Sequence, residues 1–294
     1  MVYRIGAGWS ATVKEAEKKL QAARFVECGA TQPRSAGWIE PREIAHSPLV
    51  EVIDGQWLLA LMMEQRVVPG AVVKRHVETL AARIEQTSGR KPGRKELRDL
   101  KDQALLDLMP QAFTKRATVR VWIAPTEHLL VIDAASAAKA DEVVTHLTKA
   151  LDGFNARLIN TEQSPATAMS GWLASGEPPA NFVIDRDCEL KAADGEKPAV
   201  RYARHTLDLD EIRGHLTAGK QPTRLALTWQ GRVSFVLTDG LQVKRLAFLD
   251  GVFEGRKAKQ DDSFDADAAI ATGELAPMLG ELIDSLGGEA AIQP

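Results

Sequence analysis

The sequence is poor in the residues that staple or anchor a protein. Only two of its 294 residues are cysteine, Cys28 and Cys188, and they match neither a disulfide framework nor a metal-binding spacing such as C-x-x-C. No apolar stretch approaches the roughly 18–20 residues that a membrane helix needs. The first residues also lack the apolar core of a signal peptide. We therefore expect a soluble, cytoplasmic protein with reduced thiols and no membrane contact.

Sequence motifs for nucleotide, metal and nucleophilic chemistry are also missing. The chain has no G-x-x-x-x-G-K-[ST] loop, no G-x-G-x-x-G after a strand and no G-x-S-x-G. Asp265-Ala266-Asp267 resembles the start of a calcium loop, but the later ligand positions are apolar. The acids and histidines of residues 205–215 are better explained as helix-capping and surface residues. These observations predict no catalytic residue, no metal and no cofactor.

Charge is segregated along a chain whose formal net charge is only −3. Residues 74–120 hold twelve Lys/Arg against six Asp/Glu, and residues 200–249 hold eight against four. Residues 250–294 hold three against ten. Such blocks suggest a polyanionic partner, although a charged helix face is most often only solvated. The overall composition, with 45% hydrophobic and 26% charged residues, is that of an ordinary globular protein.

Hydrophobic periodicity predicts an α+β fold of antiparallel sheets with flanking helices. The strands are predicted at residues 2–5, 37–39, 49–54, 57–63, 118–123, 129–132, 157–159, 182–185, 199–202, 224–228, 232–238 and 242–248. The helices are predicted at residues 12–24, 69–88, 95–109, 136–151, 167–173, 209–216 and 264–286, the last with a break near Thr272-Gly273. Asp54-Gly55, Gln230-Gly231 and Asp239-Gly240 predict tight hairpin turns.

Two of these helices interrupt the first group of strands. The helices at 69–88 and 95–109 are joined by the basic turn Gly89–Lys95, so we expect a helical hairpin with a positively charged tip. The predicted domains are a central α+β domain of residues 1–68 and 117–175, a helical tip insertion of residues 69–116, and a C-terminal α+β domain of residues 176–294. The Gly/Pro-rich stretch 175–179 is the candidate linker.

The aromatic residues have two predicted roles. Trp38, Trp57, Trp122, Trp172 and Trp229 lie in apolar segments, which predicts core packing for each of them. Phe113 differs because it follows Pro110 and precedes a basic stretch, at the point where the second helix of the tip ends. The pattern slightly favours a core position for Phe113, and the alternative is a contact or wedge residue.

A set of short segments, taken in order and spacing, resembles the RdgC family of bacterial recombination-associated proteins. The resemblance runs over nearly the whole chain, although family members often begin several residues earlier. Each segment is weak alone, and their order is specific. The segments are Met1–Arg4, Leu108–Phe113, Leu225–Phe235, Asp239–Leu246, Phe264–Asp267, Thr272–Leu275 and Leu286–Ala290.

The resemblance implies a ring-shaped homodimer that encloses a positively lined hole for duplex DNA. It implies binding of double-stranded DNA without sequence preference, weaker binding of single-stranded DNA, antagonism of RecA-mediated recombination, association with the nucleoid and no catalytic activity. The phenylalanine of the family's P-x-A-F motif falls on Phe113, at the contact that closes the ring. A basic pair implicated in DNA contact falls on Arg204 and His205, where the second position is commonly a neutral polar residue.

Distributed Lys and Arg with few base-reading groups are typical of a protein that binds DNA regardless of sequence. The candidate nucleic-acid-binding residues are Lys74, Arg75, Arg90, Lys91, Arg94, Lys95, Lys115, Arg116, Arg204 and His205. Two alternatives stay open, namely a regulator that contacts RecA directly and a small-molecule enzyme whose site has no visible motif. A pocket of convergent acids would favour the enzyme, and a basic concave surface would favour DNA.

Overall fold

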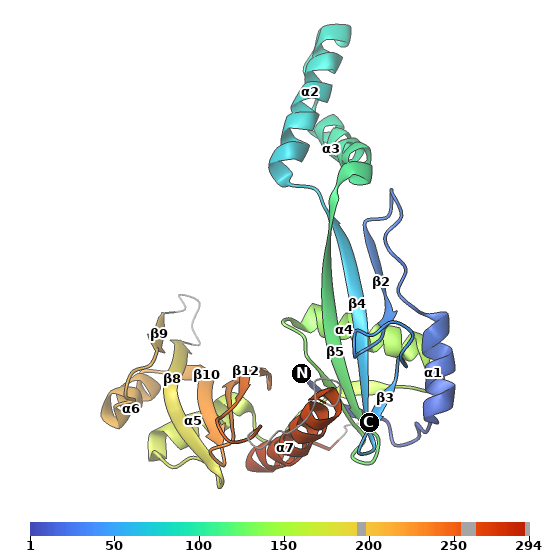
Figure 1. The fold of residues 1–294 in the computed structure, drawn as a ribbon. Coiled ribbons are helices and arrows are strands. Elements are labelled where there is room, and N and C mark those ends of the chain that lie inside the picture. The colour runs from blue at the N-terminus through green and yellow to red at the C-terminus, as the bar shows by residue number, and fades with distance from the viewer. Residues whose placement is uncertain (193–197, 254–262, 292–294) are drawn as a thin grey trace.

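The computed structural model describes residues 1–192, 198–253 and 263–291, which form two antiparallel sheets with flanking helices. The fold is therefore α+β, as predicted. In Figure 1 the first sheet stands upright and carries helices α2 and α3 at its upper end, while the second sheet lies beside its lower end. The molecule is bent, and its concave side lies between the two helices and the second sheet.

The first sheet has seven strands in the spatial order β2-β4-β5-β6-β1-β7, with β3 paired to β4. In chain order the strands are β1 (Val2–Ile5), β2 (Arg34–Ile39), β3 (Glu51–Ile53), β4 (Gln56–Val67), β5 (Phe113–Ala124), β6 (Leu129–Ile132) and β7 (Ala156–Leu158). β4 and β5 stay paired from Trp57 and Ile123 to Val67 and Phe113, and they lead to the two helices above.

One face of the first sheet is covered by helices α1 (Val13–Ala22) and α4 (Ala137–Ala150). The start of α1 is a capping box, because the Thr12 side chain accepts the Glu15 N–H and the Glu15 carboxylate accepts the Thr12 N–H. Leu20 of α1 and Leu147 of α4 are fully buried in the same cluster as Trp38. The face of β4 and β5 that packs into this cluster is covered, and the opposite face is not covered by α1 or α4.

Residues 70–111, which we call the arm, consist of α2 (Gly70–Ser88), α3 (Arg94–Leu108) and the 3-10 turn η1 (Met109–Gln111). α2 ends at Gly89, whose φ of 71° lies in the left-handed region that favours glycine. The two helices contact each other, and they bury Val73 and Ala104. β5 begins five residues earlier than predicted, because Phe113 is followed by the polar, exposed residues 114–116, so the start of the strand shows no apolar alternation.

The second sheet has five strands in the spatial order β12-β11-β10-β8-β9. The strands are β8 (Phe182–Ala192), β9 (Ala199–Tyr202), β10 (Lys220–Trp229), β11 (Val233–Thr238) and β12 (Val243–Phe248), and the helices are α5 (Pro165–Ser175), α6 (Leu209–Thr217) and α7 (Ser263–Ser285). The predicted antiparallel meander of β10, β11 and β12 is confirmed. α5 packs against α6 and β10, so it belongs with this sheet.

The break predicted in the last helix is wrong, because α7 runs without interruption through Thr272-Gly273. The buried Thr272 hydroxyl donates to the Ala268 carbonyl at 2.8 Å, so it is satisfied inside the helix. Met278 and Leu282 are buried in the adjoining core. Tertiary packing of an apolar face outweighs the weak local preference of this segment.

A single hydrophobic cluster joins the two sheets. It contains Leu227 of β10 and Met278 of α7 together with Val2, Trp122 and Leu129 of the first sheet. The second sheet is therefore packed onto the lower end of the first sheet, on the face opposite α1 and α4. Among the described helices none combines the length and apolarity that a membrane span requires.

Candidate nucleic-acid interface

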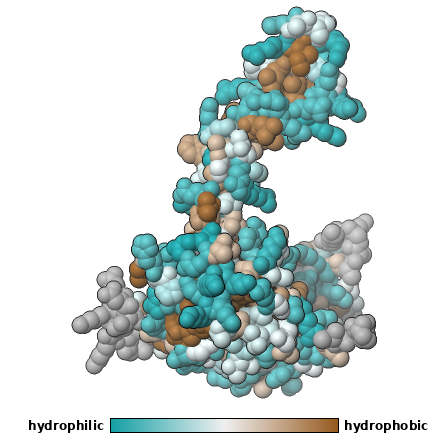
Figure 2. Space-filling model, turned by 90° about the vertical axis from the view of Figure 1, so that its right-hand side faces the viewer, coloured by the Kyte–Doolittle hydropathy of each residue, from teal (hydrophilic) through white to brown (hydrophobic). Residues whose placement is uncertain are grey.

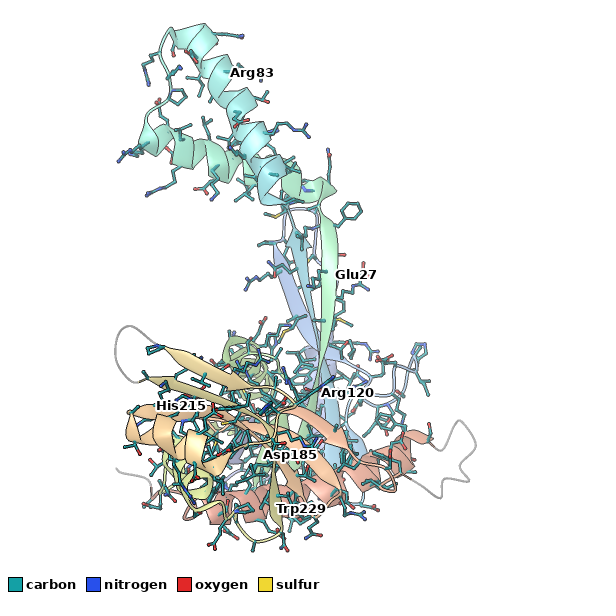
Figure 3. All side chains as sticks on the ribbon, turned by 90° about the vertical axis from the view of Figure 1, so that its left-hand side faces the viewer. Glu27, Arg83, Arg120, Asp185, His215 and Trp229 are labelled. Atoms are coloured by element: carbon teal, nitrogen blue, oxygen red, sulfur yellow. The ribbon has the colours of Figure 1, made fainter. Side chains whose placement is uncertain are left out.

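The second sheet buries one face and leaves the other uncovered. Along β10, Leu225 and Leu227 point into the core, so Arg224, Ala226 and Thr228 point the opposite way. We call this opposite side the open face. Figures 1 and 3 show α5 and α7 below the sheet and the arm above its level. The open face is therefore the part of this sheet that is available to a partner.

Cationic side chains outnumber acidic ones on the open face. Two adjoining recesses there are lined by polar, charged and a few apolar residues, and the smaller recess has a volume of about 90 Å³. Six of the lining residues are cationic and three are acidic: Arg186, Arg201, Arg204, Arg224, Lys244 and Arg245, with Asp185, Asp187 and Glu189. The surface is shallow and basic, and its acids all come from β8.

Each β8 acid on this face has a defined partner. Asp185 accepts the Thr228 hydroxyl at 2.7 Å, and Asp187 accepts the Arg204 backbone N–H at the same distance. Glu189 lies 2.8 Å from Lys191 Nζ. The three carboxylates therefore do not converge on a common point. Within the described ranges, no group of His, Cys, Asp and Glu could hold a metal ion.

Arg204 and His205 lie beside the open face, directly after β9. Arg204 has a φ of 53°, and its exposed side chain lines the larger recess. The His205 ring donates from Nδ1 to the Thr206 carbonyl at 2.7 Å, and it lies 6.4 Å from the Tyr202 ring. The Arg204 guanidinium is thus directed at a surface that already carries several cations.

The first sheet also has a free side above the junction with the second sheet. Val119 and Val121 of β5 face the covered core, so Arg116, Thr118 and Arg120 face the concave side. Arg120 is exposed, and Figure 3 shows it where the two sheets meet. It extends the basic surface of the open face onto the first sheet.

Arg116, higher on the same strand, is occupied by two carboxylates. Its guanidinium contacts the buried Glu64 at 2.8 Å and also pairs with Glu27. The Cys28 N–H and then Arg116 stabilise the charged Glu64 and lower its pKa from 4.5 to about 2. A role of Arg116 in DNA contact stays a prediction, because its charge is already balanced within the protein.

Arg66, on the strand next to Arg116, fixes the base of the arm. Its guanidinium donates to four backbone carbonyls, those of Cys28 and Gly29 on one side and of Met109 and Ala112 on the other. These contacts join the segment before β2 to the end of η1. Arg66 of β4 therefore holds the base of the arm in place.

The predicted cations of the arm lie away from the open face. Lys74 approaches Glu78 at 4.0 Å, and Arg90 forms a two-pronged contact with Glu96 at 2.7 Å. That contact with Arg90 is the main cause that lowers the pKa of Glu96 to about 2. The remaining predicted cations are exposed, and within the described ranges they form no ion pair: Arg75, Lys91, Arg94, Lys95 and Lys115. The cations of the arm are therefore separated from those of the open face by the length of the paired strands β4 and β5 (Figure 1).

Phe113 is not a core residue, so the slightly favoured interpretation is wrong. It is the first residue of β5, at the base of the arm rather than at its distal turn, and it is 88% exposed. Val67, its exposed partner across the strand pair, lies beside it. Figure 2 shows further apolar surface on the arm, where Leu97 and Leu106 are exposed.

Sequence reasoning missed six cations of the concave surface. Each of their strands carries only one or two of them, so no single strand shows a basic pattern. The strand pairing of the second sheet and its packing on the first sheet are needed to bring them together. The missed residues are Arg120, Arg186, Arg201, Arg224, Lys244 and Arg245.

Comparison with known proteins gives matches along nearly the whole chain. A family model described as "Putative exonuclease, RdgC" matches residues 1–289. A recombination-associated protein RdgC of Dechloromonas aromatica is 46% identical over 98% of this chain and 96% of its own length. Proteins of the same name from Bordetella pertussis (45% identical, 99% of this chain and 98% of theirs) and Cupriavidus pinatubonensis (44%, 98% and 97%) are similar to the same extent.

Proposed function

Because the chain belongs to the RdgC family of recombination-associated proteins, we propose that it is a non-enzymatic protein that binds duplex DNA without sequence preference. The observation that carries this proposal is the open face, where six cations and three acids line two shallow recesses. Arg120 continues this basic surface onto the first sheet.

The chemistry of the surface fits the DNA backbone better than the bases. A duplex carries one negative charge per ~1.7 Å of helix axis, and contacts to phosphates position a protein without reading sequence. The cations of the open face come from a sheet, and they surround recesses rather than project from one helix. Such a sheet can contact several phosphates at once, and these contacts do not depend on the base sequence.

The proposal includes a ring-shaped homodimer around the DNA. The bent chain has the shape of half a ring, with apolar side chains exposed on the arm and at its base. Phe113 and Val67 are apolar and accessible, which suits a contact with the same surface of a second copy. Two such chains would enclose the cationic surfaces of both.

The DNA proposal is tested by fluorescence anisotropy with two unrelated duplexes between 50 and 200 mM salt. If about six phosphates are neutralised, log K should fall with log salt at a slope near −5 for both duplexes. A flat salt response or a large preference for one duplex would contradict the proposal. Single-stranded DNA should bind more weakly in the same assay.

The proposed effect on recombination follows from occupation of DNA. A protein that coats the duplex denies RecA filaments access to their homologous partner, so inhibition of strand exchange should scale with the ratio of protein to base pairs. Increasing amounts of unrelated duplex should then restore strand exchange at a fixed protein concentration. If exchange stays inhibited while the protein is shown bound to the competitor, direct contact with RecA becomes the better explanation.

The family description includes an exonuclease, which requires a separate test. The best acidic candidates, Asp185, Asp187 and Glu189, are engaged with Thr228, the Arg204 backbone and Lys191 respectively. This arrangement supports a surface for phosphates rather than for hydrolysis. Linear duplex labelled at either end should remain intact with the protein and Mg²⁺ or Mn²⁺. The non-enzymatic proposal would be overturned if the protein released mononucleotides and if this activity disappeared when the three acids were replaced by their amides.

A further inference from the structure

Glu189 occupies a central place among the cations of the open face. It lies on β8, and in the strand register it is directly opposite Arg201 of β9 and Arg224 of β10. Its side chain is only 14% exposed, whereas those of Lys191 and Arg224 are 45% and 47% exposed. A fixed acid therefore stands between cations that reach solvent.

The surroundings of Glu189 hold its carboxylate in position and in the charged form. It accepts the Thr223 hydroxyl at 3.0 Å and lies 2.8 Å from Lys191 Nζ and 4.0 Å from the Arg224 guanidinium. The contact with Lys191 is the main cause that lowers its pKa. At neutral pH, Glu189 is therefore an anion, and it occupies the cations that a phosphate would approach.

The ion pairs made by Glu189 are weak enough to exchange. Lys191 and Arg224 are nearly half exposed, so water and salt screen their attraction to Glu189, and their flexible side chains must be ordered to keep each contact. A DNA phosphate that reaches Arg224 or Lys191 competes with Glu189 for the same charge. It is also repelled by the carboxylate, which remains in place through its hydrogen bond to Thr223.

We propose that Glu189 is an internal competitor for DNA phosphate, so that Arg224 and Lys191 exchange between this carboxylate and the DNA backbone. This inference rests on the proposed function and specifies how its surface is regulated. A cation that spends part of its time on an internal carboxylate neutralises a phosphate only part of the time, so it adds less than a full contact to the salt dependence. Glu189 thereby keeps DNA binding weak and short-lived at this point, which suits movement along a duplex.

The test is the variant Glu189→Gln, in which an amide oxygen can still accept the Thr223 hydroxyl. At 0.1 M salt the variant should bind duplex about two- to fivefold more tightly, the size of one screened charge pair. Its dissociation should be slower, and its salt slope should be steeper by up to about 0.9, because the freed cation now neutralises a DNA phosphate throughout. Thermal unfolding should confirm that the variant is folded.

Glu274→Gln is the matched control. Glu274 also pairs with an exposed arginine, Arg232, but it lies on α7, on the side of the sheet that the helices cover. The change in total charge is the same, but the sheet separates Glu274 from the open face, so it does not compete there for a phosphate. We expect less than a twofold change in affinity and no change in slope.

A second variant, Arg224→Gln, should weaken binding about three- to tenfold and reduce the gain from Glu189→Gln when the two are combined. The inference is overturned if Glu189→Gln leaves affinity and slope unchanged, if it weakens binding, or if Glu274→Gln strengthens binding equally. These outcomes leave the proposed function intact as long as the unaltered protein binds DNA. Failure of the unaltered protein to bind either duplex would instead remove the proposed function.

Discussion

Arginine serves two different purposes in the two sheets of this protein. At the base of the arm, Arg66 donates to backbone carbonyls, and Arg116, although its side chain is 44% exposed, contacts both Glu27 and the buried Glu64. On the open face of the second sheet, Arg224 and Arg245 approach carboxylates at 4.0 and 3.4 Å, and their side chains are 47% and 62% exposed. The residue type and the strand alternation are the same in both regions.

The difference lies in how completely the partners satisfy the charge. A guanidinium offers five N–H donors. Arg66 uses several of them on four fixed carbonyls, so it stabilises one arrangement of the chain. The arginines of the open face have loose contacts and most donors in water. A phosphate can therefore contact the arginines of the open face at a small cost in free energy. The arginines at the base of the arm already use their donors on groups within the protein.

The largest loss of stability is expected from Arg66→Ala. The variant leaves four carbonyls at the base of the arm without their donor, and we expect a loss of about 2–4 kcal/mol in the free energy of unfolding. Urea unfolding measures this loss. Hydrogen exchange should increase first at the arm base. Arg224→Ala, the matched change on the open face, should stay within about 0.5 kcal/mol of the unaltered protein. Equal losses in both variants would abolish the distinction.

The stability that Glu64 contributes at the base of the arm should depend on pH. Its pKa is about 2 in the folded protein against an ordinary 4.5, because it accepts the Cys28 N–H and contacts Arg116. The lowered pKa means that its contribution is fully present above pH 4.5 and is lost as the pH falls from 4.5 through about 2. The difference in melting temperature between the unaltered protein and Glu64→Gln should thus be constant from neutral pH to about pH 5 and should shrink below it. A difference that persists unchanged at pH 2 would contradict this assignment.

A smaller effect is expected from Arg204→Ala, and it concerns DNA rather than folding. Arg204 lies beside the open face with an exposed side chain, so its loss should weaken duplex binding by about three- to tenfold and reduce the salt slope by about one. Anisotropy with a salt series measures both, and the melting temperature should not change. Unaltered affinity and slope would show that Arg204 does not face the DNA.

Phe113→Ala should also have little effect on the stability of the subunit. A core phenylalanine costs ~3–5 kcal/mol on truncation, but Phe113 is 88% exposed. The free energy of unfolding of the subunit should change by less than about 0.5 kcal/mol. The proposed dimer should nevertheless be weaker, so that it dissociates at a higher protein concentration in analytical ultracentrifugation. An unchanged dimer would remove Phe113 from the proposed contact between copies.

Local sequence determined most of the elements of this protein. Thr12 and Glu15 specify the start of α1, and Gly89 ends α2 in a left-handed conformation that other residues adopt at a cost. Asp54-Gly55 sets the turn between β3 and β4. These signals act within a few residues, so one sequence is sufficient to find them. The order of short segments likewise indicated the RdgC family.

Only the tertiary structure decided which charges are available. Arg116 and Arg120 are four residues apart on one strand, but Glu64 and Glu27 from other segments occupy the first alone. The cations of the open face come from different strands of the second sheet, and the antiparallel register places Glu189 among them. Phe113 has a large apolar side chain of the kind found in protein cores. It is exposed because it lies in the last residue pair of β4 and β5. Cross-strand neighbours are distant in sequence, so their pairing depends on register and packing, which no local pattern encodes.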